Sequence, residues 1–577
     1  MSHTVSETLV KGLVDQGVTQ MFGVVGDALN SVTDAIRRTD GIRWVGTRHE
    51  EVAAFAAGAV AQLTGRLGVC AGTVGPGCIH LLNGLYDAAK SHAPVLAIAG
   101  QVPLADMGSH YFQEVDNDQL FRDVSVYHHT ITCTGQVPYA IEQAIEAALA
   151  HRGVAVLSVP GDVGSRTVEG GRPVRVFGNR VLGAPSPDAL AHAVEAINKA
   201  RTVTILAGAG ARDAREEVLA TADTLSAPMV VTLKGKEIFD WDNEFEIGQT
   251  GLLGNPAAHS ALSRCDLLLM IGTDFPYRDW YPSGPTVVQI DTSADHIGRR
   301  THVDIGLVAD AGGTLRAMAD RLRPGRDRSH LERSRDEYRQ WRDRQARLAD
   351  PEHDTGLLGG ARSAVDNPGH RIRPEAVAAL VGELADDDAV FTSDTGMATT
   401  WLARFVRLRP RQRLIGSYNL GSMANAMPQA IGIATAEPER QVVAMCGDGG
   451  LTMLLGDLIT LATYRLGVKL VVFDNNRLGM VKLEQEQAGL PEFGTVLDNP
   501  DLAAVAQAVG VQGVRISDPA QLRDGLAQAL RIPGPVLIDV LTNPDEVSVP
   551  PRTTVGQASG FAVAKLKEMV RSRGDGD

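Results

Sequence analysis

Short, continuously apolar runs alternate along the chain with longer amphipathic stretches. Seven runs of strand length lie at residues 21–25, 94–99, 154–159, 202–207, 266–271, 441–446 and 469–473. Because these runs show no in–out alternation of apolar and polar residues, they predict strands covered on both faces, as in parallel sheets with flanking helices. Many are followed directly by Gly, Pro or Asp and then by a helix-compatible stretch. The pattern therefore predicts a succession of βαβ units.

Two segments interrupt this rhythm. Residues 160–173 and 183–187 are rich in Gly and Pro, and residues 324–374 are highly charged and poor in strands, with a predicted helix around 331–348. Both are typical of connections between domains. We therefore expect an α/β protein with three doubly wound parallel-sheet domains, at residues 1–180, 187–340 and 370–545, followed by a tail at 546–577. No repeat is evident in the sequence.

Composition narrows the class of protein. Hydrophobic residues make up 44% of the 577 positions and charged residues 21%, which is ordinary for a folded chain. The formal net charge of −14, without a block of basic residues, disfavours nucleic acid as a partner. No apolar run approaches the ~18 residues needed to span a bilayer, and the first residues lack the features of a secretory signal, so we expect a cytoplasmic protein. The five cysteines contain no C-x-x-C pair and are expected to be reduced and mostly buried.

The sharpest motif is Gly447-Asp448-Gly449-Gly450, which ends a predicted strand and precedes a helix expected from about Leu451. Glycines let the backbone approach a phosphate, and a helix N-terminus offers it free N–H groups. Asn475 follows the next predicted strand, and one crossover returns the chain to the same edge of the sheet. Carboxylate and amide oxygens together with phosphates suit Mg²⁺. The pair predicts a magnesium–diphosphate site, whereas Gly-Asp-Gly alone would be read as an Asp that caps a helix.

This pair resembles the signature of thiamine diphosphate (ThDP) enzymes, Gly-Asp-Gly followed at a distance by Asn, although Asp474 stands where many members have a second Asn. The resemblance implies Asp448, Asn475 and the backbone carbonyl of Arg477 as metal ligands. It also implies a carboxyl group beside the aminopyrimidine ring, which promotes removal of the thiazolium proton. The stretch 47–58 resembles that motif, with Glu50 as the catalytic residue and Glu51 as its less favoured neighbour. Favourable placement of both carboxylates at a helix start is the alternative.

Other segments resemble the same family. Residues 75–80 resemble its active-site loop, and Gly421-Ser422-Met423 resembles the segment whose Met wedges under the thiazolium ring, although Met423 could also be ordinary core filler. For the two ThDP-binding domains, the resemblance implies contacts to the cofactor from Gly26, Gly75, His80, Asn83, Gly396, Gly421, Ser422, Met423, Gly447, Gly449, Gly450 and Met480.

The middle domain resembles the FAD-binding segments of pyruvate oxidases and acetohydroxyacid synthases, although its G-x-G-x-x-G motif is broken by Asp213. Arg278 suits an anionic diphosphate and Asp291 a ribose. The alternative is surface loops on a structural domain, since some relatives have lost the flavin. The implied FAD contacts are Gly208, Gly210, Gly251, Leu252, Leu253, Gly254, Asp274, Phe275, Pro276, Tyr277, Arg278, Asp291 and Asp310.

Nearly the whole chain is similar to the bacterial pyruvate:quinone oxidoreductase branch of this family. The resemblance implies oxidative decarboxylation of pyruvate to acetate and CO₂, with electrons passing through FAD to a quinone. Phe112 and Gln113 would lie near the reacting carbon, and Glu484 on the opposite wall. His80 sides with oxidases, whereas Met480 sides with synthases, because oxidases tend to have Phe there. Acetolactate synthase, a phosphate- and oxygen-using oxidase that makes acetyl phosphate, and a non-catalytic scaffold are the alternatives.

The resemblance also bears on assembly. In the family the carboxylate domain of one subunit faces the diphosphate domain of another, which implies a homo-oligomer, at least a dimer and by resemblance a dimer of dimers. Residues 546–577 contain a basic amphipathic stretch. It could bring the protein to the inner face of the cell membrane, or it could be a terminal helix packed on the third domain.

Overall fold

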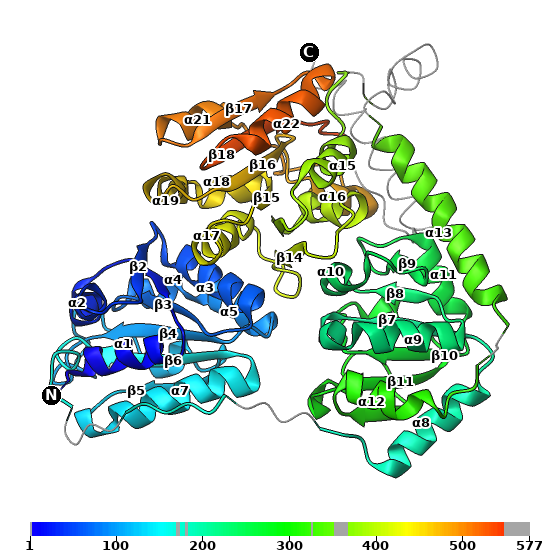
Figure 1. The fold of residues 1–577 in the computed structure, drawn as a ribbon. Helices are drawn as coiled ribbons and strands as arrows, with labels where there is room; N and C mark the ends of the chain where they lie inside the picture. Colours follow the sequence, from blue (N-terminus) through cyan, green and yellow to red (C-terminus); the bar gives the residue numbers. More distant parts are fainter. Residues whose placement is uncertain are drawn as a thin grey trace.

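The computed structural model describes residues 3–168, 173–178, 183–324, 327–350, 367 and 369–546. These residues build three six-stranded parallel sheets, each flanked by helices (Figure 1). The expected α/β class with three parallel-sheet domains is confirmed. Apart from Glu546, the tail for which membrane contact is expected lies outside the described residues. Among the described helices, none is both long and apolar enough to cross a bilayer.

The first sheet has the strand order β2-β1-β3-β4-β6-β5. Its strands are β1 Gln20–Gly23, β2 Arg43–Gly46, β3 Gly68–Gly72, β4 Val95–Gln101, β5 Ser125–Thr130 and β6 Val154–Pro160. Its helices are α1 Val5–Asp15, α2 Asn30–Arg38, α3 Glu50–Thr64, α4 Pro76–His80, α5 Leu82–Lys90, α6 Asn117–Leu120 and α7 Val137–His151. Strands β3, β4 and β6 are buried at every position, as their unbroken apolar runs predict.

The central sheet has the order β12-β11-β10-β7-β8-β9. Its strands are β7 Val203–Ala207, β8 Met229–Val231, β9 Glu246–Gln249, β10 Leu267–Ile271, β11 Thr286–Asp291 and β12 Ile305–Val308. Its helices are α8 Pro187–Lys199, α9 Arg215–Leu225, α10 Lys236–Phe239, α11 Pro256–Arg264, α12 Ala311–Ala319 and α13 Ser329–Leu348. Helix α13 falls in the segment expected to be a connection, but it packs on α11 through an Arg264–Glu337 ion pair of 2.8 Å.

The third sheet has the order β14-β13-β15-β16-β18-β17. Its strands are β13 Val390–Ser393, β14 Arg413–Gly416, β15 Val442–Gly447, β16 Val468–Asp474, β17 Gln512–Ile516 and β18 Val536–Leu541. Its helices are α15 Pro374–Leu384, α16 Met397–Phe405, α17 Ala426–Ala436, α18 Asp448–Met453, α19 Leu458–Tyr464, α20 Gly479–Gln487, α21 Leu502–Ala508 and α22 Leu522–Arg531. This order repeats that of the first sheet strand for strand, a repeat that the sequence does not show.

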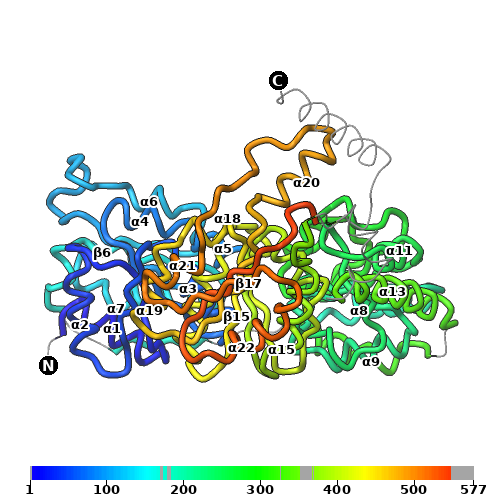
Figure 2. The backbone as a smooth tube through the Cα atoms, turned by 90° about the horizontal axis from the view of Figure 1, so that it is seen from above, coloured from blue at the N-terminus to red at the C-terminus, as the bar shows by residue number. Residues whose placement is uncertain are grey.

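The first and third domains share one hydrophobic core, which is continuous across the buried, Ala-rich helices α3 and α17. A Cβ at Gly432 would collide with the carbonyl oxygen of Ala56, so the two backbones touch. The central domain is attached to the third by buried carboxylates. Asp240 accepts a hydrogen bond of 2.7 Å from the amide of Leu408, and Glu237 accepts one of 2.7 Å from the amide of Leu414. Figure 2 shows the segment around α20 projecting from this body.

Candidate active site

Several of the residues singled out in the sequence lie at the point of each sheet where the strand order reverses. Gly26 and Gly75 follow β1 and β3, Gly208 and Asp274 follow β7 and β10, and Gly396 and Asp448 follow β13 and β15. In open α/β sheets the crevice at this point is where ligands bind, because the neighbouring loops turn away to opposite faces. The fold therefore places these residues at the sheet edges where open α/β sheets bind ligands.

Asp448 is buried at the edge of the third sheet. Helix α18 begins at Asp448 itself, so the expectation of a start near Leu451 is wrong by three residues. Asp448 Oδ1 accepts the amide of Gly449 at 2.9 Å, and Oδ2 accepts the side-chain amide of Asn499 at 2.8 Å. Burial, and then the neighbouring charge of Asp474, raise the pKa of Asp448 to about 7. A divalent cation would offset this cost, so the residues fit the metal that the motif implies.

The second predicted ligand lies on the next strand. Gly447 pairs with Phe473 across the β15–β16 ladder, and Asn475 follows β16 directly. Asn475 Oδ1 accepts the amide of Arg477 at 3.0 Å, which fixes the turn carrying the Arg477 carbonyl. The three predicted metal ligands therefore come from adjacent strand ends.

Sequence reasoning missed Asn499. Its side-chain amide bridges Asp448 Oδ2 and Asp474 Oδ1, at 2.8 and 3.0 Å. The loop that carries it returns to the metal motif through backbone bonds from Leu478 to Thr495 and from Leu497 to Asn476, both 2.8 Å. No motif spacing in the sequence predicts that this loop folds back onto Asp448.

The glycines around this edge have two different roles. A Cβ at Gly449 would lie 2.7 Å from Leu478 Cδ2, and one at Gly450 would meet the carboxylate of Asp394, so both are required by packing within the protein. At Gly396 and Gly447 a Cβ would meet nothing within 4 Å, and at Gly421 only Thr395, at 3.9 Å. The backbone at these three positions is therefore open to a diphosphate.

Glu50 is the first residue of α3 and is 7% exposed. Its Oε2 lies 2.9 Å from Nδ1 of His80, the last residue of α4, and the ring of His80 stacks on that of His49 at 4.4 Å. Glu51 is engaged differently, because its Oε1 accepts the side-chain amide of Asn83 at 2.7 Å. The structure thus distinguishes the two candidate carboxylates.

The loop of Gly421, Ser422 and Met423 meets both halves of the site. Asn83 Nδ2 also donates to Ser422 Oγ at 2.9 Å, which links the first domain to the third. A Cβ built at Gly449 would lie 3.6 Å from Met423 Cε, so the thioether end lies over the metal loop. Met423 is half-buried, which differs from the full burial of a core filler.

In the central domain most of the residues predicted to bind flavin already make hydrogen bonds or close packing contacts within the protein. The amide of Gly208 donates to the carbonyl of Ile271 at 3.0 Å and that of Gly210 to Gly272 at 2.9 Å. A Cβ at Gly251 would lie 2.9 Å from Phe275, and one at Gly254 would collide with the carbonyl of Gln249. Pro276 is half-buried and Leu252 is partly exposed. These contacts hold the 208–210, 251–254 and 272–278 loops together.

Three charged residues predicted to bind flavin differ in whether their side chains already have a partner within the protein. Asp291 Oδ1 lies 3.3 Å from His296 Nδ1, and Asp310 caps α12 through the amide of Gly313 at 2.7 Å. Arg278 is exposed, and its side chain has no hydrogen bond or ion pair with the part of the chain that the structure describes. Its guanidinium is therefore free to meet an anionic diphosphate.

Asp274 belongs to a junction of all three domains. It accepts the side-chain amide of Asn419 at 2.6 Å and lies 3.5 Å from His92 Nε2. Burial alone would raise the pKa of Asp274, but His92 and the charge of Lys234 outweigh it and hold the pKa below its ordinary range. The carboxylate predicted to contact the flavin is thus already engaged between domains.

The predicted pocket residues lie on exposed parts of different domains. Phe112 is 79% exposed, and Gln113, at φ 64°, places its carbonyl against Gly75. Glu484 is exposed on α20, beside half-buried Met480. Burial, and then the charge of Glu484, raise the pKa of Tyr277, so the central and third domains approach each other here.

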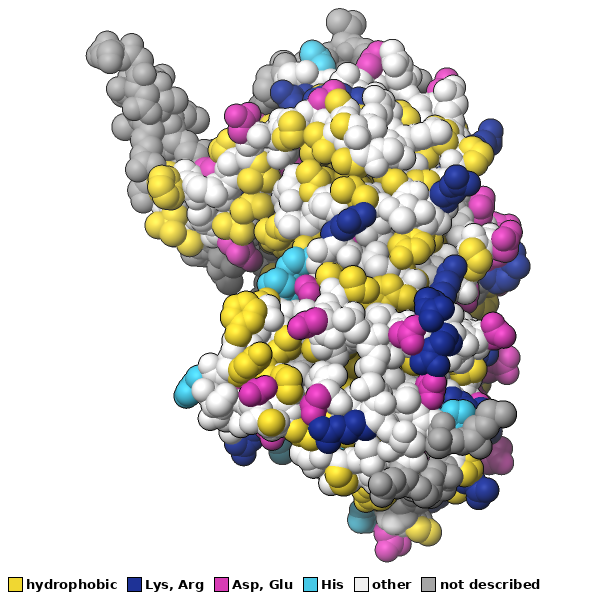
Figure 3. Space-filling view, turned by 90° about the vertical axis from the view of Figure 1, so that its left-hand side faces the viewer, with side chains coloured by type: hydrophobic (Ala, Val, Ile, Leu, Met, Phe, Trp, Pro, Cys, Tyr) yellow, Lys and Arg dark blue, Asp and Glu magenta, His cyan; other side chains and the backbone are white. Residues whose placement is uncertain are grey.

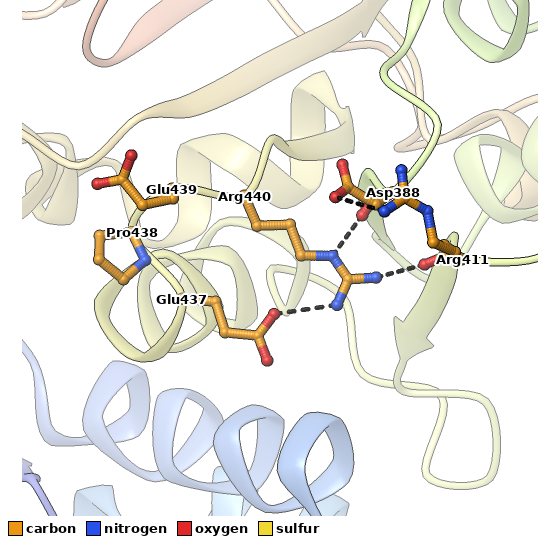
Figure 4. Close-up of a pocket in the computed structure, with 6 residues that line it drawn as sticks. All are labelled: Asp388, Arg411, Glu437, Pro438, Glu439 and Arg440. Atoms are coloured by element: carbon orange, nitrogen blue, oxygen red, sulfur yellow. Dashed lines mark hydrogen bonds and ion pairs between the residues drawn. The ribbon is translucent and has the colours of Figure 1, made fainter.

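A surface hollow of about 450 Å³ lies elsewhere, before the amino ends of β13, β14 and β15. As Figure 4 shows, the guanidinium of Arg440 is bonded to Glu437 and to the carbonyls of Asp388 and Arg411. Because these charges are already paired and lie at the opposite edge of the sheet, the hollow is separate from the candidate site.

Comparison with known proteins agrees with this geometry. Three family models match: the N-terminal TPP binding domain of thiamine pyrophosphate enzymes at residues 3–120, their central domain at 190–318 and their C-terminal TPP binding domain at 394–540. A putative thiamine pyrophosphate-containing protein YdaP of Bacillus subtilis (strain 168) is 36% identical over 99% of this chain and 97% of its own length. A pyruvate oxidase of Lactiplantibacillus plantarum is 32% identical over 93% of this chain and 88% of its own.

An acetolactate synthase large subunit of Parasynechococcus marenigrum is also 32% identical, over 96% of this chain and 90% of its own length. The oxidase and this synthase are thus equally identical to the chain, and the three family models match it one after another along its length. The chain belongs to the thiamine pyrophosphate enzyme family.

Proposed function

We propose that this protein is a ThDP-, Mg²⁺- and FAD-dependent enzyme that oxidatively decarboxylates pyruvate to acetate and CO₂ and passes the electrons to a quinone. One observation carries the proposal: the loops predicted to bind flavin contact the third domain beside the metal edge. Asp274 is bonded to Asn419, which lies two residues before Gly421. The carbonyl of Leu253 accepts Arg404 Nε at 3.2 Å, on α16. A flavin held by these loops would lie close to a cofactor held at Asp448.

The residues of the chain have distinct tasks in this reaction. Bound ThDP would supply the carbon nucleophile, and bound FAD the two-electron acceptor. Glu50, nearly buried and bonded to His80, would exchange a proton with the aminopyrimidine ring. Asp448, Asn475 and the Arg477 carbonyl would hold the metal, and the open backbone at Gly396, Gly421 and Gly447 would face the diphosphate. Arg278 would pair with the flavin diphosphate.

We also propose that the active form is a homodimer or a dimer of dimers. Exposed apolar side chains lie on loops and short helices at both edges of the site. They are Val25, Ile79, Tyr111 and Phe112 in the first domain and Met453, Val481, Leu490, Phe493 and Val496 in the third. Figure 3 shows apolar side chains gathered on this side of the molecule. A second copy would cover them, and light scattering of the purified protein would give a monomer mass if this is wrong.

Acetolactate synthase is the second candidate, because Met480 stands where oxidases tend to have Phe. One experiment separates the candidates. The absorption spectrum of the purified protein with ThDP and Mg²⁺ is recorded before and after anaerobic addition of pyruvate, and acetate, acetyl phosphate and acetolactate are quantified. Bleaching of flavin with acetate as the product supports the proposal. Acetolactate without bleaching would establish the synthase, and acetyl phosphate the phosphate-using oxidase.

Quinone use and peripheral membrane contact through residues 546–577 form a separate part of the proposal. Reduction of a water-soluble quinone by the pyruvate-reduced enzyme tests the first. Deletion of residues 558–577 tests the second, since liposome binding that survives the deletion would remove the tail from the proposal.

A further inference from the structure

The connection that leads into Glu50 is held by the third domain. It joins the end of β2 to the start of α3, whose first residue is Glu50. The amide of Gly46 donates to Tyr464 Oη at 2.7 Å, and the amide of Arg48 donates to Asp457 Oδ1 at 2.9 Å. Asp457 immediately precedes α19, and Tyr464 is the last residue of that helix. One short helix of the third domain thus meets the connection at two points.

The amide between these two is bound within the first domain. The backbone N–H of Thr47 donates to the carbonyl of Gly23 at 3.0 Å, and Thr47 Oγ1 donates to the carbonyl of His49 at 2.9 Å. Three consecutive amides before α3 therefore have fixed acceptors. Two of the three acceptors belong to the third domain, so that domain decides where α3 begins.

Asp457 stands where an aspartate ordinarily caps its own helix. It is the N-cap residue of α19, yet its side chain accepts no amide from that helix. Its Oδ1 accepts the amide of Arg48 and the hydroxyl of Thr460, at 2.9 and 2.7 Å. Asp457 is 1% exposed, so this oxygen is committed to the two bonds. The side chain serves the first domain in place of its own helix.

We infer that Asp457 and Tyr464 are positioning residues for Glu50. The backbone at a helix start sets the direction of the first-turn side chains. The Glu50 carboxylate is closely surrounded, because Oε2 lies 2.9 Å from His80 Nδ1 and a Cβ at Gly77 would lie 3.0 Å from Oε1. A shift of the first turn of α3 would move this carboxylate, and a misplacement of about 1 Å can cost about 10²-fold in rate.

The inference rests on the proton exchange proposed for Glu50, and not on the fate of pyruvate. Neither Asp457 nor Tyr464 is a predicted contact of ThDP, the metal or the substrate. Their substitution should therefore slow the proton step while cofactor binding persists.

The first readout is amide hydrogen exchange at residues 46–52 in the full chain without cofactors. Asp457→Ala removes the acceptor of the Arg48 amide, so exchange there should rise about tenfold, as for the loss of one ordinary hydrogen bond. Asp457→Asn keeps an oxygen that can accept the same amide and should stay within about twofold of the unmodified protein. Tyr464→Phe frees only the amide of Gly46 and keeps the ring. Circular dichroism checks that all three variants remain folded.

The second readout is the exchange of the thiazolium C2 proton with D₂O, measured by NMR on acid-quenched samples of the protein loaded with ThDP and Mg²⁺. Asp457→Ala should slow this exchange at least about tenfold and Tyr464→Phe about threefold, whereas Asp457→Asn should restore it. The thermal shift caused by ThDP and Mg²⁺ should persist in all three. For pyruvate turnover, kcat should fall with C2 exchange while KM stays within about twofold.

Arg43→Met is the matched control. It removes a bond of 3.0 Å from the Arg43 guanidinium to the carbonyl of Thr435, which also joins the first domain to the third, but from the other end of β2. C2 exchange should be unchanged in this variant. Equal slowing in Arg43→Met would overturn the inference, because a general loosening of the two domains would then suffice. So would C2 exchange at the unmodified rate in Asp457→Ala.

Failure of the proposed function gives a different result. An unmodified enzyme that exchanges the C2 proton but forms no acetate from pyruvate would contradict the proposed function. The slower C2 exchange of Asp457→Ala, and its rescue in Asp457→Asn, would still support the positioning of Glu50.

Discussion

The side-chain amide of Asn419 donates a hydrogen bond of 2.6 Å to Oδ2 of Asp274. Asn419 belongs to the third domain, just before the Gly421–Met423 loop, and Asp274 belongs to the loop after β10 of the central sheet. Asn419 Nδ2 also reaches the carbonyl of Lys90 at 3.2 Å, at the end of α5. One amide thus joins three domains at the place where the two proposed cofactors would meet.

Removal of this amide should loosen the junction. A hydrogen bond to a charged group is worth about 1.5–3 kcal/mol, so Asn419→Ala should slow flavin reduction by pyruvate about tenfold. Amide hydrogen exchange at residues 272–278 and 417–423 should rise. Asn198→Ala, which removes a bond of 2.9 Å to Arg321 within the central domain, is the control. Equal exchange in both variants would show that the bond does not couple the domains.

Asn499 should govern metal affinity although it is not a predicted ligand. Asn499→Ala frees Asp448 to rotate, and loss of such an orienting partner typically costs 10–100-fold in metal affinity. The measurement is the Mg²⁺ concentration needed for the thermal stabilisation that ThDP confers. Asp448→Asn should abolish that stabilisation. Wild-type Mg²⁺ dependence in Asn499→Ala would contradict the orienting role.

Glu50 and Glu51 provide a matched pair of substitutions. Glu50→Gln removes the proposed proton-exchanging carboxylate and should lower turnover by about 10²–10⁴-fold, with ThDP and Mg²⁺ still bound. Glu51→Gln keeps an oxygen that can accept the Asn83 amide, so its loss should be less than tenfold. Product formation and cofactor-induced thermal shifts are measured together. A larger loss for Glu51→Gln would reverse the assignment.

The contact of α3 with α17 should tolerate no added methyl group. Gly432→Ala drives a Cβ into the carbonyl of Ala56, which cannot move aside, and should cost about 3 kcal/mol or more in the free energy of unfolding. Gly467→Ala, where a Cβ meets nothing within 4 Å, should change it by less than about 0.5 kcal/mol. Denaturant unfolding of both variants checks this, and equal stability would show that the helices can separate freely.

His330 should make the protein less stable in acid. Burial, and then the nearby charge of Arg264, lower the pKa of His330 from 6.5 to about 4. The unfolded chain therefore binds this proton first, so the stabilisation is complete above pH 6.5 and is lost as the pH falls toward 4, by on the order of 3 kcal/mol.

Between pH 6.5 and 4, the melting temperature of the unmodified protein should drop more steeply than that of His330→Gln. In the unmodified protein His330 Nε2 lies 2.9 Å from Thr204 Oγ1, and the amide of the Gln variant can still reach this hydroxyl. His302→Gln alters a histidine that is 86% exposed and should follow the unmodified protein. Parallel curves for all three proteins would contradict a buried neutral His330.

The fold class, and the position of Asp448 and Asn475 after adjacent strands, could be predicted because both are local in sequence. Buried parallel strands are unbroken apolar runs, and Asp448 and Asn475 follow two of them directly. Asn499 could not be predicted, because it reaches Asp448 through a loop whose return depends on backbone hydrogen bonds. The engagement of Asp274 by Asn419 likewise depends on how whole domains pack, which no local pattern encodes.

Helix α13 shows a related limit. Its sequence is dominated by charged residues, which is typical of an exposed connection. Only His330, Leu331 and Ser334 are buried, yet they and the Arg264–Glu337 pair fasten the helix to the central domain. Three buried positions in a twenty-residue helix are too few to be recognised as a packing face.

The strand order shared by the outer domains gives the contact between α3 and α17 a further meaning. Each helix follows the second strand of its sheet, so the two occupy equivalent places, and Glu50 and Ala426 are their first residues. The chain therefore carries within itself a contact of the self-complementary kind that identical subunits make about a two-fold axis. A substitution at this contact on either helix therefore affects the packing of both domains at once, because α3 and α17 share one core.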